Sequence, residues 1–124
     1  IIHENDYQID KFEMKVVSDT EDIQLTFSKQ KNSKKLFIDY NKLQFPLLFR
    51  PWKEGDSFMP LGMKNFKKLS DYFVDNKFSL IQKKKARLLI SQNRIVCVLA
   101  KKCSRVDERF KFGPESKKAY IVNI

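Results

Sequence analysis

Few of the residues that build metal or redox centres are present in this sequence. Its 124 residues include two cysteines and one histidine. Five residues separate Cys97 from Cys103, and His3 is distant from both, so the ligands of a zinc site are not supplied and we expect no bound metal. Cys97 lies inside the apolar run 95–99, which indicates a buried thiol. We expect a reduced protein, although the sequence leaves an intramolecular disulfide open.

Long hydrophobic runs and targeting signals are also missing. No apolar stretch approaches the ~20 residues of a membrane span. His3, Glu4 and Asp6 follow the first two isoleucines directly, which is unlike the basic and then apolar start of a signal peptide. We therefore expect no contact with a membrane and a cytoplasmic location. Because the chain begins with isoleucine rather than methionine, we expect a fragment of a longer protein, with residues 1–124 forming one compact domain.

The sequence lacks a catalytic set of its own. Its three glycines, Gly55, Gly62 and Gly113, are isolated, so no glycine-rich phosphate loop is present. One distant histidine offers no general base for a nucleophilic serine, and no carboxylates occur as a distinctive pair. We expect no catalytic residues in this chain.

What the sequence has in excess is positive charge, with a formal net charge of +10. Residues 1–49 hold seven lysines against eight acids, whereas the remaining 75 residues hold 18 bases against seven acids. All the excess therefore lies after Phe49. This asymmetry indicates one basic face and a polyanionic partner rather than a uniformly basic protein.

Alternating apolar and polar positions predict strands in the first half of the chain. The intervening residues 18–22 have turn composition, and residues 29–35 form a polar link typical of a solvated loop. Pro46 and Pro51 disfavour helix between them. The strands are expected at residues 12–17, 23–27 and 36–40.

The second half has a mixed pattern. Gly55 and Gly62 mark two tight turns. Helical spacing predicts a short helix from Leu69 to Asn76, and Ser79 is a candidate cap for a second helix that ends at Ala86. Residues 88–90 and 95–100 are expected to pair as strands through a turn at 91–94, and a last strand is expected at 119–122. The whole pattern predicts a mainly β domain with one or two helices near the middle, in the α+β class.

The segment from Arg50 to Arg87 carries ten bases against four acids. Lys67 and Lys68 precede or open the first helix, where the helix dipole disfavours cations by about 0.3–1 kcal/mol each. A bound phosphate would reverse this preference. The alternative is that both side chains point into solvent.

Two further basic clusters follow. Lys83, Lys84, Lys85 and Arg87 lie in or beside the second helix, where they either follow a phosphate backbone or form a solvated surface. The next cluster comprises Lys101, Lys102, Arg105 and Arg109. Three clusters from separate segments favour one shared polyanion-binding face.

Two other features allow more than one interpretation. Trp52 lies between Pro51 and Lys53, where it either packs in the core or stacks on a base, and we favour packing. Asp107 and Glu108 lie between Arg105 and Arg109. We interpret these acids as ion-pair partners of the arginines rather than as an acidic site.

A series of short motifs resembles the C-terminal domain of bacterial tRNA(Ile)-lysidine synthetases. The resemblance extends from about Leu48 to Tyr120, so residues 46–124 are interpreted as the motif region and residues 1–45 as a variable, β-rich part. The motifs are Arg50-Pro51, Gly55-Asp56, Pro60-Leu61-Gly62, Lys67-Lys68-Leu69, Asp71-Tyr72-Phe73 and Arg105-Val106-Asp107-Glu108-Arg109-Phe110.

This resemblance implies a fold and a function. The family's C-terminal domain is a layered β-sandwich with covering helices, similar to a domain of the phenylalanyl-tRNA synthetase β-chain. The full enzymes use ATP to adenylate the wobble cytidine of tRNA-Ile and join lysine to it, which changes decoding from AUG to AUA. ATP and lysine belong to an N-terminal catalytic domain with a Ser-Gly-Gly-x-Asp-Ser loop that this chain lacks, so no cofactor is expected here. The implied partners are tRNA-Ile, on its acceptor-stem side, and the catalytic domain.

The residues proposed for phosphate contact are basic, and those proposed for structural ion pairs are acidic. The alternative function is a protein–protein or dimerisation module that docks on the catalytic domain, with Trp52 and Phe58 as anchors and a homodimer left open. A single-strand binder is a third interpretation, disfavoured because the aromatics are dispersed. The tRNA-binding candidates are Arg50, Lys53, Lys64, Lys67, Lys68, Lys83, Lys84, Arg87, Arg105 and Arg109, and the ion-pair candidates are Asp56, Asp107 and Glu108.

Overall fold

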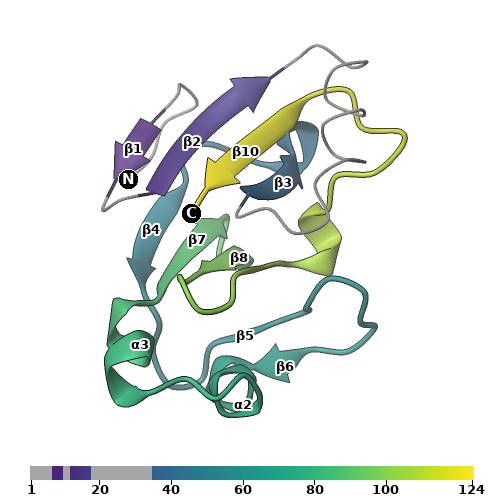
Figure 1. Ribbon diagram of the computed structural model, residues 1–124. Coiled ribbons are helices and arrows are strands. Elements are labelled where there is room, and N and C mark those ends of the chain that lie inside the picture. The colour runs from purple at the N-terminus through teal and green to yellow at the C-terminus, as the bar shows by residue number, and fades with distance from the viewer. Residues whose placement is uncertain (1–6, 10–11, 18–34) are drawn as a thin grey trace.

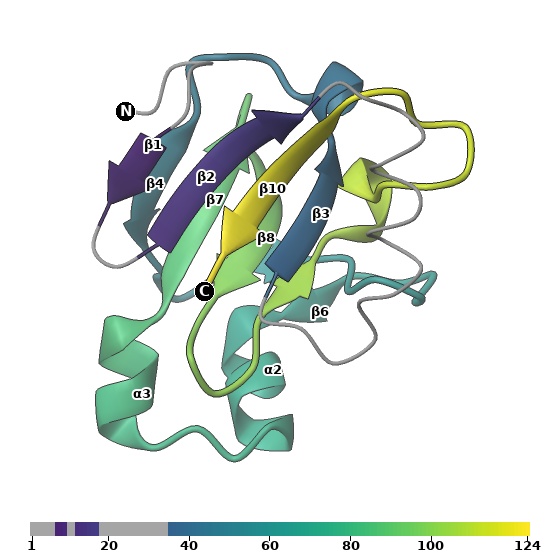
Figure 2. The same ribbon diagram turned by 45° about the horizontal axis from the view of Figure 1, so that its top comes forward.

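Two antiparallel four-stranded sheets form the body of the protein in the computed structural model, which describes residues 7–9, 12–17 and 35–124. Figure 2 shows the first sheet in front of the second, with the helices and a two-stranded ribbon at one end. The first sheet has the order β1 (Tyr7–Ile9), β2 (Phe12–Val17), β10 (Ala119–Asn123) and β3 (Lys35–Asp39). The second has the order β4 (Leu48–Pro51), β7 (Arg87–Ser91), β8 (Arg94–Leu99) and β9 (Arg105–Val106).

The first sheet confirms the strand predicted at residues 12–17 and the last strand, which pair with each other. In β2, Phe12 and Met14 are buried against the second sheet, as the alternation required. The extended stretch predicted at 36–40 is β3, which ends at Asp39 and continues into a 3-10 turn, Tyr40–Lys42. The predicted turn at 18–22 and strand at 23–27 lie outside the described residues, as does most of the link at 29–35.

The central strands of the second sheet, β7 and β8, are buried on both faces, which explains their continuous apolar runs. Leu89 and Cys97 face the first sheet, whereas Leu88 and Val98 face the helical end. Side chains alternate between the two faces, so a strand covered on both sides needs apolar residues at every position. The predicted turn between β7 and β8 is confirmed, with positive φ at Gln92 and Asn93.

The helical end consists of two short helices and a ribbon. In α2 (Leu69–Asp75), the predicted apolar face is buried through Leu69, Tyr72 and Phe73. Helix α3 (Leu80–Lys85) begins with the predicted cap: the Ser79 hydroxyl accepts a hydrogen bond from the Gln82 N–H, and the Gln82 side chain accepts one from the Ser79 N–H. The ribbon pairs β5 (Ser57–Phe58) with β6 (Lys67–Lys68).

These elements form the layered β-sandwich with covering helices that the resemblance implied (Figure 1). Gly55 and Gly62 adopt φ values of 94° and 89°, so both predicted turns use the left-handed freedom of glycine. In the described part of the chain, no helix has the length and hydrophobicity needed to cross a membrane.

Candidate nucleic-acid interface

Several basic segments of the second half belong to the helical end of the sandwich, which contains α2, α3 and the β5–β6 ribbon (Figure 1). The structure brings two of the predicted clusters together: Lys85 and Arg87 line one pocket with Lys101 and Lys102. The arginines of the third cluster, by contrast, contact the ribbon. The predicted clusters are thus divided between a pocket and a ribbon.

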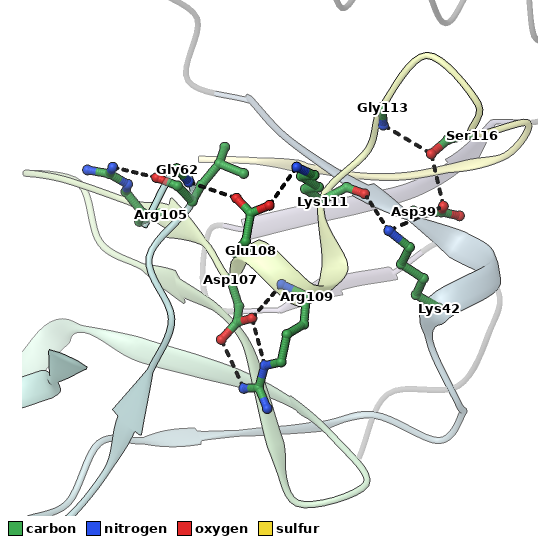
Figure 3. Close-up of polar contacts among 11 residues, drawn as sticks. Asp39, Lys42, Gly62, Arg105, Asp107, Glu108, Arg109, Lys111, Gly113 and Ser116 are labelled. Atoms are coloured by element: carbon green, nitrogen blue, oxygen red, sulfur yellow. Dashed lines mark hydrogen bonds and ion pairs between the residues drawn. The ribbon is translucent and has the colours of Figure 1, made fainter. Parts of the chain in front are cut away.

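Segment 105–108 holds the loop of the ribbon in place (Figure 3). Arg105 Nη2 donates to the Leu61 carbonyl at 2.7 Å. The Glu108 carboxylate accepts from the Gly62 N–H at 2.8 Å, and Asp107 accepts from the Met59 N–H at 2.9 Å. The loop between β5 and β6 therefore has a defined path although it is exposed.

Asp107 is fully buried and is neutralised by Arg109. Glu108 instead forms an ion pair with Lys111. The hydrogen bond from Lys111, together with that from the Gly62 N–H, lowers the pKa of Glu108 below its ordinary value. The interpreted pairing with an arginine therefore holds for Asp107, whereas Glu108 pairs with a lysine, and no carboxylate partner of Arg105 is found among the described residues.

Arg50, in β4, and Asp56, in the turn that follows, form a second ion pair. Arg50 Nη1 and Nη2 donate to Asp56 Oδ2 and Oδ1 at 2.9 and 3.0 Å, and the Lys53 N–H donates to Oδ2 at 2.8 Å. Burial raises the pKa of Asp56, but the bonds from Arg50 and Lys53 outweigh it and leave the pKa lowered. The hydrogen bond that Arg50 donates to Asp56 in turn raises the pKa of Arg50. Arg50 is therefore held by the fold.

Lys67 and Lys68 lie before α2 as predicted, but they differ in environment. Lys67 forms an ion pair with Asp75, the last residue of α2. This contact corrects the expectation that folding gives no reason for a cation there. Lys68 is exposed, caps the helix with its backbone only, and has no ion-pair partner within the described ranges.

Other lysines of the predicted set have no ion-pair partner among residues that the structure describes. Lys53 and Lys64 are exposed in the turn after β4 and in the ribbon loop. Lys84 is exposed on α3, whereas Lys83 is half-buried. Arg87 is bound to the end of α3, because its Nη1 donates to the carbonyls of Lys84 and Ala86.

The aromatic residues confirm one interpretation and correct another. Trp52 packs edge-on against Phe73, with ring centroids 5.0 Å apart, so the packing role favoured for it is confirmed. Phe58 is fully buried and cannot anchor a partner. Among the aromatic side chains whose burial is described, the exposed one is Phe66 in the ribbon loop, which is 56% exposed and has the Arg109 guanidinium 4.9 Å from its ring centroid.

Sequence reasoning left four residues of this end out of the candidate set. Lys85, Lys101 and Lys102 were recognised as members of basic clusters. That they line one pocket depends on the loop after β8 lying beside α3, which the sequence does not show. No sequence pattern indicated that Phe66 is exposed, because its exposure depends on the position of the ribbon loop. Burial of apolar residues is the usual expectation, so the sequence favoured a core position for it.

Comparison with known proteins identifies relatives of one kind. The chain is 48% identical over 101 residues to a tRNA(Ile)-lysidine synthase of Parabacteroides distasonis, covering 82% of this chain and 22% of that protein. It is 37% identical over 87 residues to that of Bacteroides thetaiotaomicron, covering 70% of this chain and 20% of the relative. The chain thus spans about a fifth of the length of these relatives. It matches no protein-family model.

Two solved structures share the fold. A crystal structure of the TilS C-terminal domain superimposes with a TM-score of 0.68 at 15% identity, covering 90% of this chain and 80% of that one. An N-terminal fragment of the phenylalanyl-tRNA synthetase β-subunit from Pyrococcus horikoshii gives 0.58 at 19% identity, covering 83% of this chain and 31% of the other. The predicted resemblance to the C-terminal domain of tRNA(Ile)-lysidine synthetases is confirmed.

Proposed function

Because this chain is homologous to a segment of the tRNA(Ile)-lysidine synthases and has the fold of their C-terminal domain, we propose that it is the tRNA-contacting module of such an enzyme. The parent enzyme is a ligase that uses ATP to join lysine to the wobble cytidine of tRNA-Ile in the cytoplasm. ATP and lysine are bound by its catalytic domain. The present module holds the acceptor-stem side of the tRNA.

One observation carries this proposal: exposed lysines without ion-pair partners in the described structure occur in three segments of the helical end. Lys53, Lys64, Lys68 and Lys84 are exposed there. Cations without ion-pair partners on one end of a domain attract a polyanion, and the counterions released from its phosphates on contact favour binding. We assign these four lysines to direct contact with phosphates.

The arginines have a supporting part in this proposal. Arg50 and Arg109 are engaged by Asp56 and Asp107, and Arg105 is engaged by the Leu61 carbonyl. Each retains some exposure and adds to the positive potential, but its geometry is set by these partners. Lys67 and Lys83 are half-buried and make the same indirect contribution.

Double-stranded RNA exposes phosphates and 2′-hydroxyls rather than readable base edges, so such a surface recognises shape. The module therefore orients the tRNA, and selection among tRNAs depends on its combination with the catalytic domain. We expect it to bind several folded tRNAs with similar affinity.

An apolar patch on α2 and α3 favours a second candidate function. Val74, Leu80 and Ile81 are 67%, 67% and 64% exposed, which is unusual for three large apolar side chains on adjacent helices. This patch would dock the module on the catalytic domain, or on a second copy of the chain. It is compatible with tRNA binding by the lysines, since the patch contains none of them.

Fluorescence anisotropy with labelled tRNA at low salt tests the main proposal. Micromolar or tighter binding by the 124-residue chain, lost on adding salt, supports it. No binding at low salt contradicts it and leaves the docking role. Size-exclusion chromatography of the chain, alone and mixed with the catalytic domain, tests the docking role. The double variant Leu80→Ser with Ile81→Ser should abolish any association that the unaltered chain shows.

A further inference from the structure

A surface pocket of about 330 Å³ lies where β2, α3 and the loop after β8 meet. Phe12, Phe78 and Ala100 line it with apolar atoms. Phe12 belongs to the core between the two sheets, whereas Phe78 and Ala100 belong to the core beneath the helices. The volume is at the lower end of the roughly 300–1,000 Å³ typical of small-molecule sites.

Four cations surround this apolar floor: Lys85, Arg87, Lys101 and Lys102. No carboxylate lines the pocket in the part of the chain that the structure describes, and none of the four has an ion-pair partner there. Like charges gathered around one small cavity repel one another, and a bound anion converts this repulsion into attraction. The pocket is therefore suited to an anionic group.

Two polar side chains at the pocket are already oriented by the fold. Arg87 uses only its Nη1 in the bonds to the Lys84 and Ala86 carbonyls, at 2.7 and 2.9 Å, and its Nε and Nη2 N–H groups have no acceptor among the described residues. Gln82 accepts from the Ser79 N–H at 2.7 Å through Oε1, which leaves its amide NH2 as a donor. A guanidinium held in this way suits a phosphate, and an amide donor suits a carbonyl or ring nitrogen of a base.

We propose that this pocket binds one unpaired nucleotide of the RNA held by the module. The phosphate lies among Arg87, Lys101 and Lys102, and the base lies against Phe12, Phe78 and Ala100. A base inside a duplex is stacked and paired and cannot reach such a floor, whereas an unpaired base can be turned into it. This inference rests on the proposed function and adds to it a preference for RNA with a single-stranded end.

Binding of matched RNA hairpins tests the inference. We compare a blunt hairpin with the same hairpin carrying a three-nucleotide single-stranded 3′ extension, using the complete 124-residue chain. The extended hairpin should bind at least about fivefold more tightly, since contact of one base with aromatic side chains alone has this effect. Lys101→Gln with Lys102→Gln should reduce that ratio to about one.

The matched control is Lys53→Gln with Lys64→Gln, which also removes two positive charges. These lysines are proposed duplex contacts, so both hairpins should lose affinity and their ratio should stay unchanged. An extension built from abasic nucleotides should lose the advantage. If the abasic extension keeps it, phosphate attraction alone is responsible and the base pocket is wrong.

Failure of the inference is distinguishable from failure of the proposed function. Equal binding of both hairpins by the unaltered chain overturns the pocket and leaves tRNA binding intact. Absence of binding to either hairpin at low salt overturns the proposed function itself. If adenosine monophosphate shifts the NMR signals of Lys101 and Lys102 while the extension gives no advantage, the ligand is a free nucleotide and the RNA assignment is wrong.

Discussion

Arg109 and Asp107 are joined by two parallel hydrogen bonds of 3.0 Å, from Nε to Oδ1 and from Nη2 to Oδ2. The carboxylate is fully buried and also accepts from the backbone N–H groups of Met59 and Arg109. It therefore connects the ribbon, the end of β9 and the guanidinium beside Phe66. The sequence motif around Asp107 builds the scaffold on which exposed cations are displayed.

Asp107→Ala should lower the free energy of unfolding by about 2–4 kcal/mol, because it leaves the Met59 N–H and the Arg109 guanidinium without their acceptor. This cost lies toward the lower end of the range expected for breaking a buried ion pair, since the Arg109 side chain is 29% exposed. Urea denaturation measures it. Glu54→Ala, at an exposed site in another turn, is the control and should change stability little. A loss below about 0.5 kcal/mol for Asp107→Ala would mean that this carboxylate is not a structural acceptor.

Stability should fall in acid as Asp56 becomes protonated. Its pKa is lower in the folded protein than in the unfolded chain, so the unfolded state takes up protons first and the stabilisation is present only above the unfolded pKa. The loss should begin near pH 4 and continue as the pH falls through the folded value. Thermal melts from pH 7 to pH 2 should show a shallower decline for Asp56→Asn than for the unaltered chain. Identical pH profiles would contradict this role of the Arg50 pair.

Ser79→Ala should destabilise the protein by about 1 kcal/mol, because it removes the acceptor for the Gln82 N–H at the start of α3. Ser79→Asp should retain most of the stability, since a carboxylate caps equally well. Both variants are compared by urea denaturation. Equal stability of the alanine and aspartate variants would indicate that the cap contributes little to this helix.

Lys67→Ala and Lys68→Ala should separate two roles that the sequence assigns together. Lys67→Ala removes a partly exposed ion pair with Asp75 and should cost up to about 1 kcal/mol of stability. Lys68→Ala should leave the melting temperature unchanged while weakening tRNA binding. Melting curves and anisotropy titrations on the same samples measure both effects. A clear loss of stability in Lys68→Ala would make that lysine structural.

The sequence could predict those parts of the fold that local patterns determine. Alternation gave β2, helical spacing gave α2, and the Ser79–Gln82 spacing is a local capping signal. Burial of β7 and β8 on both faces explains why these two strands appear as apolar runs. The insertion of β10 between β2 and β3 depends on pairing between distant segments, for which no local pattern exists.

The candidate site was less accessible to sequence reasoning, for a related reason. Charge counts show that the excess of basic residues lies after Phe49, but they cannot show which cations are neutralised. Lys67, in β6, pairs with Asp75 at the end of α2. Asp107 accepts a hydrogen bond from Met59, which lies 48 residues earlier in the chain. Only the folded arrangement separates such held cations from Lys64 or Lys68.

The salt dependence of tRNA affinity tests the central claim most directly. Each lysine–phosphate contact contributes roughly 0.7–0.9 to the slope of log K against log salt. Lys64→Gln with Lys68→Gln should therefore make the slope shallower by about 1.4–1.8 and lower affinity at low salt, whereas Arg94→Gln, at the turn of the β7–β8 hairpin, should change neither. A slope that is the same in the double variant as in the unaltered chain would contradict the assignment of these lysines to the RNA backbone.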